Sequence, residues 1–169
     1  LVGENASLLV WTTTPWTLPS NMFAAVHADF DYSYVKVEGG EVYVVASELV
    51  SPLTEKLGWT VVEETKVKGK ALIGKRYTPP FDTYLRDHQG DARYFKVVAG
   101  DRSNTAQPQW FVTLDAGTGI VHMAPAFGDD DWKVWRNLKQ KDNSVEMFCA
   151  VKPDGKLDDR LASLGLDDE

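Results

Sequence analysis

The sequence predicts a mainly β fold, either a sandwich or a barrel, with a few peripheral helices. Three observations support this prediction. Short segments of strand-forming residues recur between turn residues, only two segments have helical spacing, and 43% of the 169 residues are hydrophobic. A chain of this length and composition can bury one core, so we expect residues 1–169 to form a single domain.

The predicted strands are short segments bounded by glycine, proline or polar residues. Segments 32–37 and 42–46 are joined through Gly39 and Gly40, which is typical of a hairpin because glycine adopts positive φ at little cost. Pro79-Pro80 excludes a central strand there, because proline lacks the donor that a sheet needs. The other predicted strands are 7–13, 59–63, 66–73, 93–99, 110–114 and 120–123.

Two segments have the apolar spacing of helices. The first runs from Ser47, which can cap a helix, to about residue 57, and Gly58 is placed to end it. The second begins near Gly128 with three aspartates in its first turn, where negative charge meets the positive end of the helix dipole. We expect a polar loop at 100–107, a turn at 153–155 and a frayed acidic end from Asp167.

The net charge of −7 argues against a surface that grips nucleic acid along its length, because such proteins usually carry a basic face. Positive charge is concentrated in one run, which consists of Lys66, Lys68, Lys70, Lys75 and Arg76. This run is most simply a solvated strand and turn. Contact between the protein and the end of one nucleic-acid strand remains open.

The composition also bears on location. Cys149 is the single cysteine, so an internal disulfide is excluded, and we expect a reducing, cytoplasmic environment. No run approaches the roughly 18 apolar residues of a membrane span, and the first ten residues lack signal-peptide features, so no membrane association is expected. The chain begins with Leu1 and not with Met, and we interpret it as a fragment of a longer protein.

Several signatures of common chemistry are missing from the sequence. It contains no Walker-type phosphate loop, no GxGxxG and no GxSxG elbow. One cysteine and the histidines His27, His88 and His122 have no zinc-ligand spacing, so we expect no metal site. The sequence therefore does not predict nucleotide-driven, serine-elbow or zinc chemistry.

A first polar motif, WTTTPWTLPSN, spans residues 11–21. Its prolines stiffen the chain and leave the hydroxyls of Thr12, Thr13 and Thr14 projecting from a fixed loop. Hydroxyl groups both donate and accept hydrogen bonds, which suits a sugar hydroxyl, a carbonyl or a water molecule. Composition alone also allows a plain alternative, in which the threonines simply end a strand.

A second motif, GTGIVHMAPAFGDDD, spans residues 117–131. The motif predicts a strand that ends in His122, a loop with Pro125 and a helix that opens with aspartates. This arrangement can bring an imidazole and a carboxylate to the mouth of one cavity. Two alternatives remain open at this point: His122 can be a structural histidine, and the aspartates can serve only as helix caps.

Together the two motifs resemble the signatures of isoleucyl-tRNA synthetase editing domains. Residues 12–21 resemble the threonine-rich peptide of this family, and residues 117–131 resemble its second signature, GTGIVHxAPAFGxDD. Residues 74–81, GKRYTPPF, resemble a segment between them more weakly. Valyl and leucyl relatives typically differ at the positions of Thr14-Pro15 and Ala126-Phe127, so the isoleucyl branch is indicated. The HIGH and KMSKS signatures are absent, as expected of an inserted domain.

The resemblance implies a β-barrel-like editing domain of class I synthetases that removes valine wrongly attached to isoleucine tRNA and excludes the isoleucyl product. Asp131 would bind the α-ammonium group of the substrate and stay ionised in the first turn of its helix. His122 would line the side-chain pocket and help to exclude isoleucine. The implied catalytic residues are Thr13, Thr14, His122 and Asp131, and the implied substrate-binding residues are Thr12, Thr13, Thr14, Asn21, His122 and Asp131.

The implied partners are the 3′ end of tRNA(Ile) carrying valine, valyl-adenylate and the rest of the synthetase chain. No metal or cofactor is implied for editing, although the parent synthetase uses ATP, and we expect a monomer. Two other functions remain open. The chain can be a binding module for the tRNA acceptor end that is inactive without the parent enzyme, or a non-catalytic interaction module.

Overall fold

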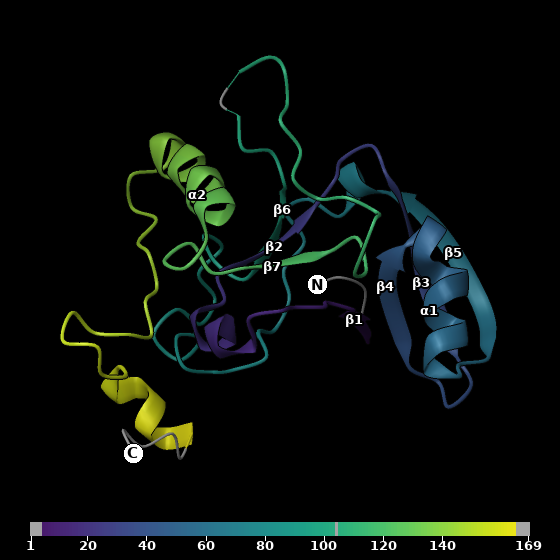
Figure 1. The fold of residues 1–169 in the computed structure, drawn as a ribbon, viewed down its shortest axis with the longest axis horizontal. Coiled ribbons are helices and arrows are strands. Elements are labelled where there is room, and N and C mark those ends of the chain that lie inside the picture. The colour runs from purple at the N-terminus through teal and green to yellow at the C-terminus, as the bar shows by residue number, and fades with distance from the viewer. Residues whose placement is uncertain (1–4, 104, 165–169) are drawn as a thin grey trace.

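The computed structural model describes residues 5–103 and 105–164. Within these residues, the strands form two open sheets, and the two α-helices lie on the outer sides of the molecule (Figure 1). The prediction of a β architecture with a few peripheral helices is confirmed, although the described strands form no closed barrel.

The first sheet has the strand order β1-β4-β3-β5. Its centre is the predicted hairpin of β3 (Asp31–Val37) and β4 (Val42–Ala46), which pair antiparallel. Strand β1 (Ala6–Leu8) lies parallel to β4, and β5 (Val61–Lys68) is the exposed edge strand beside β3.

The second sheet has the order β6-β2-β7 and carries one end of the site described below. Its central strand, β2 (Phe23–Val26), is buried along its whole length. Strand β6 (Lys96–Ala99) pairs parallel with β2, and β7 (Val121–Met123) pairs antiparallel with it, which places His122 opposite Ala24.

Helix α1 (Val50–Leu57) covers one face of the first sheet, and helix α2 (Asp129–Lys141) packs beside the second sheet. Gly58 ends α1 with a φ of 67°, as predicted from its sequence position. Helix α2 also matches its prediction, with Gly128 at the N-cap. The short 3₁₀ helices are η1 (Pro15–Ser20), η2 (Ser47–Leu49), η3 (Gly69–Ala71) and η4 (Asp159–Leu164).

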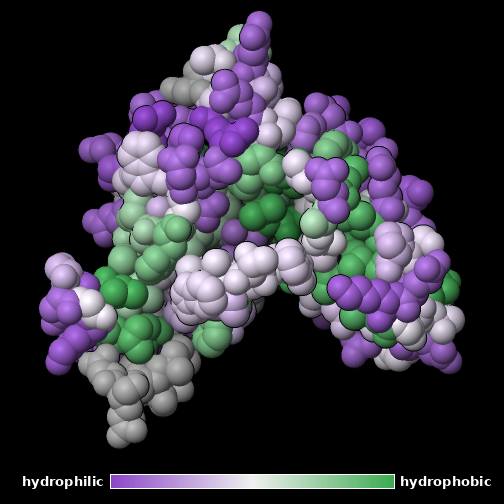
Figure 2. All heavy atoms as spheres, in the orientation of Figure 1, coloured by the Kyte–Doolittle hydropathy of each residue, from purple (hydrophilic) through white to green (hydrophobic). Residues whose placement is uncertain are grey.

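One hydrophobic cluster joins the two sheets and fixes their relative position. It combines Ala24 and Val26 of β2 with Tyr32 of β3 and Val44 of β4. The Tyr32 hydroxyl donates a hydrogen bond to the Gly119 carbonyl over 2.7 Å, which ties the first sheet to the second motif. Figure 2 shows apolar side chains gathered in the hollow between the two parts of the molecule.

Several predicted strand limits are wrong. Strand β1 covers only the start of 7–13; it ends at Leu8, and beyond it only the Leu9 N–H still donates to the Val44 carbonyl of β4. Segments 59–63 and 66–73 are replaced by the continuous edge strand β5 and η3. Segment 110–114 contributes only an isolated bridge at Trp110. Strand β2 was not predicted, because a short run buried on both faces has no alternation.

Other expectations have mixed outcomes. Segment 93–99 forms a strand only from Lys96, and segment 120–123 forms β7 from Val121. Ser47 does not cap α1; it begins η2, and its hydroxyl lies 2.7 Å from that of Ser33. The turn at 153–155, the lack of a strand at 79–80 and, outside residue 104, the loop at 100–107 are confirmed, with one isolated bridge at Asp101. The acidic end from Asp167 lies outside the described residues.

Candidate functional site

The two sequence motifs line one cavity of about 770 Å³. The first motif enters on the loop between β1 and η1, and the second on β7 and the first turn of α2. The two motifs meet because β2, which follows η1 in the chain, pairs with β7. The predicted site residues that line this cavity are Thr12, Thr13, Thr14, His122 and Asp131.

The threonine loop is held by its own backbone and hydroxyls. The Thr12 hydroxyl accepts the N–H of Thr14 over 3.0 Å, and Thr14 precedes Pro15, the first residue of η1. The Thr14 carbonyl accepts both the N–H and the hydroxyl of Thr17, at 3.0 and 2.8 Å. The Thr13 hydroxyl has no hydrogen-bond partner among residues 5–103 and 105–164. It is therefore free to bind a ligand in the cavity.

His122 lies at the base of this loop with both ring nitrogens hydrogen-bonded. Nε2 lies 3.0 Å from the Thr17 hydroxyl, and Nδ1 lies 2.8 Å from Nδ2 of Asn21. Asn21 Nδ2 also donates to the Phe23 carbonyl over 3.1 Å, and its Oδ1 accepts the Tyr77 hydroxyl over 2.6 Å. These contacts fix the orientation of the Asn21 amide, because a flipped amide would place Oδ1 against the Phe23 carbonyl, and both atoms are acceptors.

The direction of these hydrogen bonds decides the state of His122. Because Asn21 donates to Nδ1, the imidazole proton is on Nε2, which donates to the Thr17 hydroxyl, and Thr17 donates to the Thr14 carbonyl. Burial lowers the pKa of His122 to about 4, and the residue is 8% exposed. His122 is therefore a neutral, fixed wall of the cavity and is not available as a general base at neutral pH.

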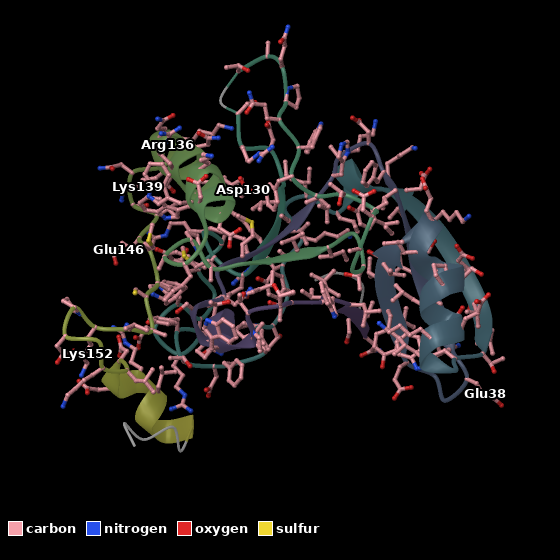
Figure 3. The ribbon with its side chains drawn as sticks, in the orientation of Figure 1. Glu38, Asp130, Arg136, Lys139, Glu146 and Lys152 are labelled. Carbon is pink, nitrogen blue, oxygen red and sulfur yellow. The ribbon has the colours of Figure 1, made fainter. Side chains whose placement is uncertain are left out.

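Asp131 is the aspartate of the second motif that faces the cavity without an ionic partner. Asp129 pairs with Lys133, and Asp130 pairs with Arg102, whereas Asp131 forms no ion pair within the described part of the chain. Figure 3 shows Asp130 in the first turn of α2. The Asp131 carboxylate accepts the N–H of Ala124 over 2.8 Å, which links α2 back to the end of β7.

The environment of Asp131 suits a cationic ligand. Burial raises its pKa to about 6, the nearby Asp130 charge adds to the rise, and the hydrogen bond from Ala124 opposes it. The ionisation of Asp131 at neutral pH stays a prediction, and burial opposes it. A half-buried carboxylate of this kind gains most from a ligand that brings a positive charge.

Asn21 lies apart from the other predicted site residues. It is buried behind His122 and lines a second cavity of about 630 Å³ on the far side of the threonine loop. Its contact with a substrate stays a prediction. Thr17 and Tyr77, which complete the network, were not predicted as site residues. Their signals were their places in the first motif and in segment 74–81.

The mouth of the main cavity carries exposed aromatic rings. Trp11, Trp16 and Phe127 line the cavity, and Trp16 is 71% exposed. Exposed rings beside a polar cavity can stack on a planar base or sugar. The charged lining is acidic, with three aspartates and no lysine or arginine. Within the described residues, no group of three or more His, Cys, Asp or Glu side chains could hold a metal ion.

Comparison of the sequence with known proteins identifies its relatives. It is 39% identical to the isoleucine–tRNA ligase of Nocardia farcinica over 90% of this chain, and 46% identical to that of Mycobacterium tuberculosis over 78%. This chain is homologous to a region of the isoleucine–tRNA ligases. It spans 13% and 11% of the length of these two relatives. No family model matches the chain.

The fold agrees with this relationship to the isoleucine–tRNA ligases. The structure matches GlLeuRS-CP1 with a TM-score of 0.60 and 19% identity, over 84% of this chain and 49% of the other. It matches the editing domain of the Plasmodium falciparum cytosolic leucyl-tRNA synthetase with a TM-score of 0.54 and 15% identity, over 82% and 48%. The chain thus has the fold of a CP1 editing domain of class I synthetases.

Proposed function

We propose that this chain is the editing domain of an isoleucine–tRNA ligase, and that it hydrolyses valine from mischarged tRNA(Ile) and from valyl-adenylate while sparing isoleucyl-tRNA(Ile). The homology and the CP1 fold support this proposal. Isoleucyl-tRNA synthetase is the established example of the underlying problem, in which one missing methylene is worth only about 1–3 kcal/mol and a second site must remove the error.

The observation that carries the proposal is the Asp131 carboxylate, half-buried at the cavity wall without an ionic partner in the described residues. An aminoacyl ester has an α-ammonium group on the carbon next to its ester carbonyl. Pairing with this ammonium would relieve the desolvation of Asp131 and fix the ester beside the threonine loop. The hydroxyls of Thr12, Thr13 and Thr14 then bind the ribose, the ester carbonyl and a water molecule.

In the proposed reaction, the water oxygen forms a bond to the ester carbonyl carbon, and the bond from that carbon to the ribose oxygen breaks. The proton lost by water ends on the ribose oxygen, so the products are valine and a tRNA with a free hydroxyl. His122 contributes shape and not a base, because both ring nitrogens are engaged. Rate enhancement then rests on positioning a water molecule beside an already activated ester.

A second candidate function is a binding module that needs the rest of the synthetase for catalysis. The acidic cavity lining, which contains no lysine or arginine, favours this alternative because nothing in it would hold tRNA phosphates. The short span of the chain relative to its relatives points the same way. On this alternative, the acceptor end would be gripped by other parts of the ligase.

The decisive experiment compares three esters with the chain at high concentration. Val-tRNA(Ile), Ile-tRNA(Ile) and a valyl-adenosine ester are incubated with the wild-type chain, and release of the amino acid is followed. Selective loss of both valyl esters would support editing by the chain alone. Selective binding of valyl-adenosine without hydrolysis would support the binding module. Equal hydrolysis of the valyl and isoleucyl esters would contradict selective editing.

We propose a cytoplasmic location and a monomeric domain joined to the rest of its ligase. The location is supported by a relative from Arabidopsis thaliana named isoleucine–tRNA ligase, cytoplasmic, which is 37% identical over 94% of this chain. No helix within the described residues is long and apolar enough to cross a membrane. The proposal includes no cofactor or metal for editing; ATP would serve the complete ligase.

A further inference from the structure

We propose that Tyr77 is a positioning residue of the editing site, whose hydroxyl holds the Asn21 amide in place against His122 and thereby restrains the threonine loop. This inference rests on the proposed function. Tyr77 belongs to the segment 74–81, which lies outside both motifs. Within the described residues, Asn21 is the only hydrogen-bond partner of its side chain.

Tyr77 is anchored independently of the site. Its backbone N–H donates to the Phe95 carbonyl over 2.9 Å, and its ring packs against the core clusters on both sides of the second sheet. Its hydroxyl donates to Asn21 Oδ1 over 2.6 Å. A phenol held in this way gives Asn21 a hydrogen-bond partner whose position does not depend on the residues that it orients.

The contact from Tyr77 is passed along four groups. The Tyr77 hydroxyl donates to Asn21 Oδ1 and the Phe23 carbonyl accepts from Asn21 Nδ2, so Nδ2 faces Nδ1 of His122. His122 must then carry its proton on Nε2 and donate to Thr17, which leaves the Thr17 proton for the Thr14 carbonyl. Reversing any one step would set two donors or two acceptors against each other. The position of the loop carrying Thr14 is therefore linked to Tyr77.

The variant Tyr77→Phe removes only the hydroxyl. Asn21 Oδ1 then has no donor in its buried place, and the amide is held only through Nδ2. The Phe23 carbonyl still excludes a flipped amide, so we expect His122 to keep its tautomer while Asn21, the imidazole and the loop lose part of their restraint. Valyl-ester hydrolysis should fall about tenfold in kcat, the effect of losing one buried hydrogen bond, with a smaller change in KM.

The matched control is Tyr94→Phe. Tyr94 is a buried tyrosine whose hydroxyl makes one hydrogen bond, from the Glu146 N–H over 2.8 Å, and it does not line the cavity. Both variants should lose similar thermal stability. Only Tyr77→Phe should change the ring ¹⁵N signals of His122 in position or width at pH 7, with His27 and His88 as internal references.

The outcomes separate this inference from the proposed function. A wild-type His122 protonated on Nδ1, or a Tyr77→Phe variant with unchanged His122 ring signals and unchanged kcat, would overturn the role of Tyr77. Changed ring signals together with reduced kcat would support it. A wild-type chain that hydrolyses no ester would overturn the proposed activity, while the ring signals, which need no substrate, still decide whether Tyr77 positions His122.

Discussion

Asn21 donates a hydrogen bond to Nδ1 of His122 across 2.8 Å, although the two residues are 101 positions apart in the chain. The contact exists because the segment after η1 leads directly into β2, and β2 pairs with the strand that carries His122. It leaves His122 neutral and without a free nitrogen. The chemistry of the cavity therefore depends on Asp131, on the threonine hydroxyls and on water.

Asp131→Asn should abolish most of the proposed hydrolysis without unfolding the chain. Asparagine keeps the shape and can still accept the Ala124 N–H through Oδ1, but it cannot pair with an ammonium group. We expect kcat/KM for the valyl ester to fall about 10- to 100-fold, the range for losing a hydrogen bond to a charged group. Asp129→Asn, an exposed position in the same helical turn, is the control, and equal losses in both variants would contradict the assignment.

The pH dependence of hydrolysis should follow the ionisation of Asp131. Its pKa of about 6 means that the carboxylate becomes protonated as the pH falls below 6, so kcat/KM should fall about tenfold per pH unit there. His122, with a pKa of about 4, should add no inflection between pH 5 and 8. Rates measured from pH 4.5 to 7.5 would test this, and a flat profile would count against Asp131 as the ammonium ligand.

Asp131 and His122 should affect stability in opposite directions. Asp131 has a folded-state pKa above its ordinary 3.8, so its ionisation weakens the fold as the pH rises from about 4 to about 6. His122 has a folded-state pKa below 6.5, so the unfolded chain takes up its proton first and stability falls as the pH drops towards 4. Each effect is at most about 3 kcal/mol.

The Asp131→Asn variant separates these two effects. Only the His122 contribution remains in it, so the difference in unfolding free energy, variant minus wild type, should grow by about 1–3 kcal/mol between pH 4 and pH 7. Urea unfolding at several pH values measures this difference directly. The expected result is a variant that is more stable and less active at neutral pH, which is common when a functional charge is buried. A pH-independent difference would exclude a burial-raised pKa.

Thr17→Val should loosen the threonine loop while conserving side-chain shape. The variant leaves the Nε2 proton of His122 without an acceptor and removes the hydroxyl donor to the Thr14 carbonyl. We expect a loss of about 1–3 kcal/mol in unfolding free energy, together with slower hydrolysis. Thr83→Val is the control, because the buried Thr83 hydroxyl has no partner within the described residues and its removal should be neutral or stabilising.

Gly119→Ala should test the structural role of the glycines in the second motif. Gly119 has a φ of 73°, and an added Cβ would lie 2.4 Å from the Cβ of Ala46. We expect a loss of about 2–4 kcal/mol in unfolding free energy. Gly58→Ala is the matched control, with a φ of 67° and no atom within 4 Å, and should lose only about 1 kcal/mol. Equal losses would mean that close packing against Ala46 is unimportant.

Much of the fold could be predicted where the signal is local. The β3–β4 hairpin follows from Gly39-Gly40 and from alternating side chains, and α2 follows from its aspartates and apolar spacing. Strand β2 could not be predicted, since four residues buried on both faces have no period to detect. The split of segment 59–73 into two strands was wrong because β5 is an exposed edge strand, where burial imposes no alternation.

The sequence by itself determined the two motifs, their order and the polar residue types in them, because these depend only on side-chain identity and short-range spacing. The tertiary structure alone decided that Asn21 lies behind His122, that Tyr77 joins them, and that Asp131 lacks an ionic partner in the described residues. Hydrogen-bond direction and desolvation depend on what the fold brings within a few ångströms. Hydrogen-bond direction and desolvation therefore depend on residues that are distant in the chain, and neither segment alone determines them.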